Sequence, residues 1–145
     1  MTIPDRIERV LDLAHPPEKV WEALTTAEGL GGWFGDNADI DLRPGGEAHV
    51  HWDGIGRSTL WIQVVEPVHR FGYTWAIEGL PADDPRRTYV EFTLDPIGTG
   101  TRLTVVETGF AQLGAGDDPV TAYTGNVEGW RTELAELVEF LDTSA

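Results

Sequence analysis

Cysteine is missing from this chain of 145 residues, and lysine occurs only at position 19. Without cysteine the chain cannot form a disulfide, bind a metal through thiolates or use a thiol nucleophile. The 25 acidic residues outnumber the 10 basic ones and give a formal net charge of -15. Such a surface repels nucleic-acid phosphates and anionic lipid headgroups, so we expect neither nucleic acid nor a membrane among the partners.

Long apolar runs are also missing, and none approaches the roughly 18 residues that a membrane span requires. The segment Met1 to Arg6 shows no basic stretch followed by an apolar one, so we expect a cytoplasmic location. No linker, repeat or charge block divides the chain, and 41% of its residues are hydrophobic. We predict one soluble domain over 1–145, present as a monomer or a homodimer.

The common motifs of nucleophilic, metal and nucleotide chemistry are absent, because the sequence has no GxSxG, HExxH, GxxxxGK or GxGxxG. We therefore expect no cofactor. His49 and His51 share one face of a predicted strand with Glu47, a spacing that superficially suggests metal ligands. Because the apolar side chains of Ala48 and Val50 point into the core, the histidines face outward, and we predict no metal site.

Alternating apolar and polar residues predict a sheet of antiparallel strands. The segment Thr88–Leu94 is the clearest example, with Val90 and Phe92 on the inward face. The predicted strands are Ile7–Ala14, Asp36–Leu42, Glu47–Trp52, Thr59–Glu66, Arg70–Ile77, Thr88–Leu94 and a last one that contains Leu103, Val105 and Glu107.

Two short helical segments are predicted after the first strand, over Glu18–Leu24 and Ala27–Leu30. The second ends at a glycine pair, which places Trp33 and Phe34 in a loop as a lip or a plug. Two large aromatic residues at such a point predict a contact with whatever lies beneath the loop.

The C-terminal segment has the strongest pattern, because apolar residues recur there at spacings of three and four and predict a helix of about twenty residues. These residues are Val120, Tyr123, Val127, Trp130, Leu134, Leu137 and Leu141. A helix of this kind needs a large apolar surface to cover, which the inward face of the sheet offers. We predict an α+β fold in which a curved antiparallel sheet wraps around this helix.

Several short motifs follow one another along the chain in a defined order. They are Pro16–Thr25, Trp33, Val65–Pro67, Thr74-Trp75, Gly100–Thr104, Thr108–Phe110 and Gly129-Trp130. Together they resemble the family related to the activator of Hsp90 ATPase, within the START-like (SRPBCC) superfamily, over about Ile7 to Leu141. The resemblance implies the helix-grip, Bet v 1-like fold, with a cavity between sheet and helix that the superfamily uses for sterols, lipids, polyketides and plant hormones. At Glu107 relatives often carry histidine, so a role of that histidine does not transfer.

Such a cavity would be lined where the loop, the inward face of the sheet and the helix stripe converge. We predict that its lining residues are Trp33, Phe34, Trp52, Tyr73, Trp75, Phe92, Glu107, Phe110, Tyr123, Val127, Trp130 and Leu134. Gly125 and Gly129 either leave room for a ligand above the helix or allow close packing on the sheet. Both readings explain why a helix retains them.

Glu107 has two interpretations. Its parity with Leu103 and Val105 aims its carboxyl group into the apolar interior, where it could fix a ligand's polar end or act as an acid or base. Alternatively, the alternation breaks at the end of the strand and the side chain reaches water.

Three hypotheses of function follow. In the first, the protein carries, sequesters or senses a small hydrophobic molecule and is not an enzyme. In the second, it is a cavity enzyme of the cyclase or hydrolase type that uses Glu107 and Tyr123. In the third, it is a stress-related, co-chaperone-like protein whose exposed Trp33-Phe34 anchors a protein partner.

Overall fold

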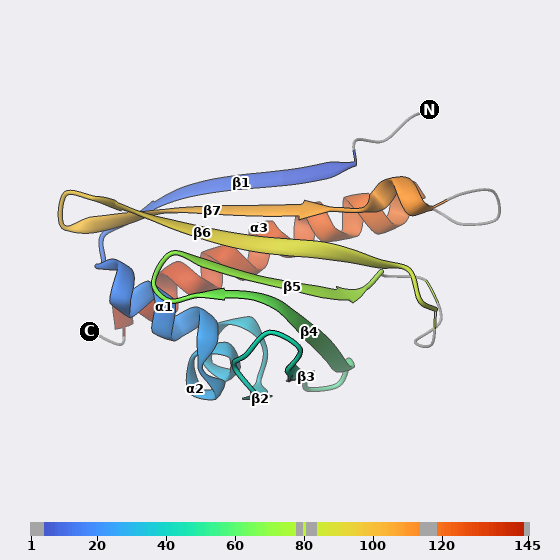
Figure 1. The fold of residues 1–145 in the computed structure, drawn as a ribbon, viewed down its shortest axis with the longest axis horizontal. Coiled ribbons are helices and arrows are strands. Elements are labelled where there is room, and N and C mark those ends of the chain that lie inside the picture. Colours follow the sequence, from blue (N-terminus) through green and yellow to red (C-terminus); the bar gives the residue numbers. More distant parts are fainter. Residues whose placement is uncertain (1–4, 78–79, 81–83, 114–118, 144–145) are drawn as a thin grey trace.

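Seven antiparallel strands form one sheet in the computed structural model, which describes residues 5–77, 80, 84–113 and 119–143 (Figure 1). The strands are β1 (Arg6–Leu13), β2 (Asn37–Ile40), β3 (Glu47–Trp52), β4 (Gly56–Glu66), β5 (Arg70–Ala76), β6 (Arg87–Ile97) and β7 (Gly100–Thr108). Their order in the sheet is β1-β7-β6-β5-β4-β3-β2, and every neighbouring pair is antiparallel. The predicted strands are therefore confirmed.

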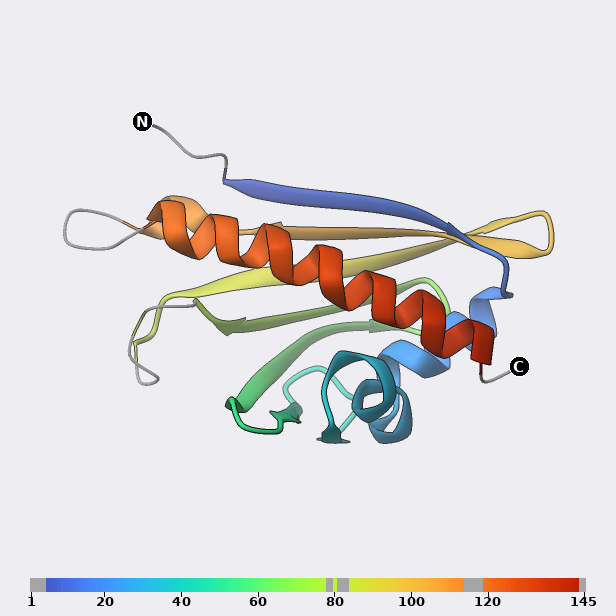
Figure 2. The same cartoon turned by 180° about the vertical axis from the view of Figure 1, so that it is seen from behind.

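One long helix covers one face of this sheet (Figure 2). The helical elements are α1 (Pro17–Thr25), α2 (Ala27–Gly29), a π-helical turn η1 (Leu30–Phe34), a 3-10 turn η2 (Phe110–Gln112) and α3 (Pro119–Thr143). The C-terminal end of α3 lies beside α1, where the Lys19 ammonium donates a hydrogen bond of 3.1 Å to the Leu141 carbonyl. A cation at this position complements the negative end of the helix dipole. The predicted α+β helix-grip architecture is confirmed.

The core lies between α3 and the sheet, as the alternation predicts. Val90 and Phe92 on β6 are at most 2% exposed, as are Leu103 and Val105 on β7. The register pairs Glu107 of β7 with Val90 of β6, so this glutamate belongs to the inward row of side chains. Strand parity thus carries a carboxylate into the core.

The first turn of α3 departs from the predicted apolar stripe. Leu141 and Leu134 are at most 3% exposed and Val127 is partly buried, but Val120 is 44% exposed. These four residues are seven apart, and a straight α-helix turns by about 20° with each heptad. Over three heptads the drift of about 60° carries Val120 off the buried face. Ala122 takes the buried position instead.

Trp33 and Phe34 do not form the predicted loop, because the chain continues from α2 into the π-helical turn η1. Both side chains are 2% exposed, and the Trp33 indole donates a hydrogen bond of 2.7 Å to the Ala23 carbonyl. The glycine pair lies on the other side of this turn, where Gly32 faces the ring of Phe140. The prediction of an exposed Trp33-Phe34 pair is wrong.

Within the described residues, no helix has the length and apolar character needed to cross a bilayer. Residues 1–4, part of the segment behind the expected cytoplasmic location, lie outside the described range. That location stays a prediction.

Candidate ligand-binding groove

A groove of about 370 Å³ opens between the N-terminal half of α3 and the part of the sheet formed by β3, β4 and β5. Its walls are mostly apolar, and most of the α3 residues among them share one face of the helix. The lining residues are Phe34, Trp52, Ile55, Ser58, Trp75, Ala76, Gly125, Asn126, Gly129, Trp130 and Glu133. A hollow of this size is at the lower end of the range for small-molecule sites.

Four aromatic rings form one side of the groove, with Phe34 at their centre. The Phe34 ring stacks on those of Trp75 and Trp130, with centroids 5.8 and 5.9 Å away, and meets Trp52 edge-on at 5.4 Å. Trp75 and Trp130 are themselves 5.7 Å apart. The turn η1, two strands and α3 thus each contribute to one continuous aromatic surface.

Gly129 leaves space on the side of the groove that α3 forms. A Cβ atom built at this residue would meet no atom within 4 Å apart from its immediate neighbours in the helix. Close packing on the sheet therefore does not explain this glycine, although it costs the helix about 1 kcal/mol relative to alanine. Of the two explanations that the sequence leaves open, the one that leaves room above the helix fits Gly129.

Glu107 lies beneath the groove, and four donors surround its carboxylate. The indoles of Trp75 and Trp130 donate hydrogen bonds of 2.8 and 2.9 Å, one to each oxygen. The Asn126 amide donates to both oxygens at 3.0 and 2.9 Å, and the Thr88 hydroxyl donates to Oε2. The side chain is 0% exposed, so the predicted alternative of a solvent-exposed strand end is wrong.

These bonds make Glu107 a link between the sheet and the helix. Its donors come from β5, β6 and α3, and three of them, Trp75, Asn126 and Trp130, also line the groove. Both oxygens of the carboxyl group thus have their hydrogen-bond donors within the protein. Glu107 holds the walls of the groove in place and is not itself one of the lining residues.

Glu133 and Tyr73 each have a buried polar atom near the groove that makes no hydrogen bond. Within the described residues, Glu133 Oε2 and the Tyr73 hydroxyl are buried without a hydrogen-bond partner. Burial raises the pKa of Glu133 to about 8, the nearby carboxylates of Glu136 and Asp36 add to the rise, and a hydrogen bond from Trp52 opposes it. Burial, followed by the charges of Glu107 and Glu133, raises the pKa of Tyr73 well above its usual value.

The structure divides the twelve predicted lining residues into three groups. Four line the groove, namely Phe34, Trp52, Trp75 and Trp130. Six are buried in the core, namely Trp33, Tyr73, Phe92, Glu107, Phe110 and Leu134. The other two lie elsewhere on α3: Val127 packs on the core, and Tyr123 pairs edge-to-face with Phe110, with centroids 5.3 Å apart.

Aromatic and aliphatic side chains occupy the space below the middle of α3. The ring centroids of Phe92 and Trp130 are 5.8 Å apart, and those of Tyr73 and Trp75 are 5.5 Å apart. What these contacts leave is an open groove to one side of the helix. Ile55, which is 84% exposed, is at its rim.

Sequence reasoning missed five lining residues, namely Ile55, Ser58, Ala76, Asn126 and Glu133. The spacing of residues in the C-terminal helix could have indicated two of them, Asn126 and Glu133. Asn126, Gly129 and Glu133 are three and four residues apart and therefore share one face, beside the buried stripe. A polar row that includes a glycine at such a position marks a helix face without a packing partner.

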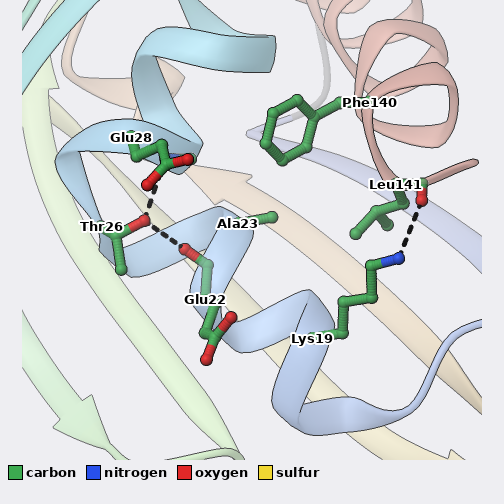
Figure 3. Close-up of a pocket in the computed structure, with 8 residues that line it drawn as sticks. Lys19, Glu22, Ala23, Thr26, Glu28, Phe140 and Leu141 are labelled. Carbon is green, nitrogen blue, oxygen red and sulfur yellow. Dashed lines mark hydrogen bonds between the residues drawn. The ribbon is translucent and has the colours of Figure 1, made fainter. Parts of the chain in front are cut away.

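A second hollow, of about 380 Å³, lies between α1, α2 and the end of α3 (Figure 3). Several of its polar groups bind one another: the Thr26 hydroxyl donates to the Glu22 carbonyl at 2.7 Å and accepts from the Gly29 amide at 2.9 Å. Lys19 is bound to Leu141, as described above. These bonds join the helices, so this hollow is a weaker candidate than the aromatic groove.

The outward-facing His49 of β3 contacts acidic side chains along the sheet. His49 Nδ1 lies 2.7 Å from Asp39 Oδ1, and its Nε2 lies 3.3 Å from Glu47 Oε1. Among the residues that the structure describes, no group of histidine and acidic side chains is arranged to hold a metal ion.

An antiparallel sheet that grips a long C-terminal helix, with two short helices after its first strand, defines the START-like, helix-grip class of proteins. The comparison with protein families assigns the chain within that class. The model described as "Activator of Hsp90 ATPase homolog 1-like protein" matches residues 14–142, and the chain belongs to this family. No curated protein matches the chain significantly.

Solved structures show the same fold over nearly the whole chain. Protein MLL2253 from Mesorhizobium loti is 30% identical, with a TM-score of 0.81 over 97% of this chain and 98% of its own. DynU16, a protein of the dynemicin biosynthetic locus, is 22% identical, with a TM-score of 0.79 over 98% of this chain and 49% of its own. PFC0360w, an HSP90 activator from Plasmodium falciparum, is 17% identical, with a TM-score of 0.78 over 96% of this chain and 97% of its own.

Proposed function

We propose that the protein binds a small hydrophobic molecule in the aromatic groove and thereby carries, sequesters or senses it. The observation that carries the proposal is the open space at Gly129, in the groove that the rings of Phe34, Trp75 and Trp130 also line. Apolar walls and an unfilled helix face leave surface in contact with water that a hydrophobic ligand would bury.

An enzyme that uses Glu107 has less support. Glu107 is covered by Trp75, Asn126 and Trp130, and both of its oxygens already accept hydrogen bonds. A general acid or base must come within hydrogen-bond reach of the substrate, which these covering side chains prevent. The other residue of that hypothesis, Tyr123, packs on Phe110 and lies outside the groove lining.

A co-chaperone role is a weaker alternative for this chain. Its support is the name of the family and the likeness to an HSP90 activator from Plasmodium falciparum. The surface anchor that this role needs is not Trp33-Phe34, because both residues are 2% exposed. A pull-down of an ATPase chaperone from the cell extract would revive this alternative with a different surface.

Filling the groove tests the proposal directly. We expect a polarity-sensitive naphthalene dye to bind the wild-type protein, quench the emission of Trp75 and Trp130 and raise the melting temperature, because a ligand of the folded form stabilises it. Gly129→Leu places a side chain in the open space and should abolish binding without loss of stability.

Thr124→Leu is the matched control, because Thr124 is exposed on the same helix and does not line the groove. It should bind the dye as the wild type does. Equal dye binding by wild type and Gly129→Leu would place the dye elsewhere. A failure of a broad library of lipids, sterols and aromatic compounds to change either signal would refute the proposed function.

A further inference from the structure

We propose that the ligand of this groove is an organic amine, whose cationic nitrogen binds the carboxylate of Glu133 while the aromatic rings cover its apolar part. This inference rests on the proposed function and names the chemical class of the molecule that is bound. It makes Glu133 the residue that determines specificity.

The residues that line the groove favour a ligand with a basic group. Of the eleven lining residues, Glu133 alone has an acidic side chain, and lysine, arginine and histidine are absent from the set. Its Oε2 atom is buried and has no hydrogen-bond partner within the described residues. A buried acceptor without a donor is costly, and a ligand that brings an N–H donor removes this cost.

The charges around Glu133 decide the sign of the ligand. Glu136 on α3 and Asp36, which lies between η1 and β2, are close enough to raise the pKa of Glu133. The sheet contributes Glu107 of β7 and Tyr73 of β5. The charges of Glu107 and Glu133 both raise the pKa of the Tyr73 phenol, which is therefore neutral. A cation in the groove is attracted by these groups, and an anion is repelled.

The aromatic surface provides the second interaction that an amine needs. Trp52, Trp75 and Trp130 line the same hollow as Glu133, and the faces of tryptophan rings attract cations. The net charge of -15 also attracts cations from solution toward the protein. A neutral ligand would use the rings alone.

Three probes of nearly equal size and shape test the inference: 1-(aminomethyl)naphthalene, 1-naphthalenemethanol and 1-naphthoate. We expect the amine to bind at least about tenfold more tightly than the alcohol at pH 7 and low ionic strength, and the carboxylate to bind most weakly. Calorimetry in buffers of different ionisation enthalpy should show that the amine, and not the alcohol, releases protons, because a nearby cation favours the ionised form of Glu133.

Glu133→Gln should remove both the preference for the amine and the proton release, and leave the affinity for the alcohol within about twofold. Glu139→Gln is the matched control, because it makes the same substitution at an exposed position of α3 outside the groove. It should keep the preference, and circular dichroism should show that both variants are folded.

The outcomes separate this inference from the function on which it rests. If the alcohol and the carboxylate bind as tightly as the amine, the inference is wrong and the hydrophobic groove stands. If the preference for the amine survives Glu133→Gln, Glu133 is not its cause and the inference is again wrong. If none of the three probes binds the folded protein while the neutral dye does, the amine class is excluded. If no hydrophobic compound binds, the proposed function fails first.

Discussion

Replacing Glu107 tests whether one buried carboxylate fastens α3 to the sheet. In Glu107→Ala, the donors on Trp75, Thr88, Asn126 and Trp130 lose their acceptor together. Each buried donor left without a partner costs about 1–3 kcal/mol, but the variant also removes the cost of burying a charge. Water that enters from the groove can accept hydrogen bonds from some of these donors. We therefore expect the free energy of unfolding to fall by about 3–5 kcal/mol.

The isosteric Glu107→Gln is the sharper variant, because it keeps the volume of the side chain and replaces an acceptor with a donor. The Thr88 hydroxyl can rotate to accept a hydrogen bond, but the Trp75 indole can only donate. One N–H group would then point at another, and we expect a loss of about 2–4 kcal/mol. Trp75→Phe removes the opposing donor, so it should cost less in the E107Q background than in the wild type.

Urea unfolding followed by tryptophan fluorescence and far-ultraviolet circular dichroism gives the four free energies of this double-mutant cycle. Glu139→Gln, exposed on α3, is the control for loss of one negative charge and should change the free energy of unfolding by less than about 0.5 kcal/mol. A loss below about 1 kcal/mol for Glu107→Gln would refute the claim that both Glu107 oxygens accept hydrogen bonds from these donors. A cycle without coupling would refute the specific contact with Trp75.

Three further predictions concern the groove. Because the pKa of Glu133 is raised to about 8, its protonated form favours folding: stability should fall by about 1–2 kcal/mol as pH rises from 4.5 through 8, and urea unfolding of Glu133→Gln should lack this component. Gly129→Ala should raise the free energy of unfolding by about 1 kcal/mol, and a loss would mean that the space at this residue is occupied. Ile55→Ser should weaken dye binding several-fold at the rim while the melting temperature stays nearly unchanged, since this side chain is 84% exposed in the free protein.

Much of the fold could be predicted from the sequence, because the two regular backbone geometries impose their own periods on the side chains. The period of two along β6 and β7 placed Val90, Phe92, Leu103 and Val105 inward, and the structure confirms each of them. The same parity pointed Glu107 inward, although the end of a strand left a second interpretation open. The spacing of Trp130, Leu134, Leu137 and Leu141 predicted the buried face of α3 for the same reason.

The groove itself required the tertiary structure. Four of its predicted residues, Phe34, Trp52, Trp75 and Trp130, do line it, but their mutual distances depend on how η1, the sheet and α3 dock. The burial of Trp33 and the exposure of Val120 depend on a π-helical turn and on helical drift, which apolar spacing does not encode. The donors of Glu107 lie 19 to 32 residues away along the chain, so no local pattern could reveal them.

The sequence by itself therefore determined which side chains of β6 and β7 face inward, because that choice depends on backbone geometry within one element. The tertiary structure decided which inward side chains meet, where Gly129 leaves space and which polar atoms of Glu133 remain without a partner. Those outcomes depend on the packing of elements that are distant in sequence, where side-chain volume and hydrogen-bond geometry select one arrangement.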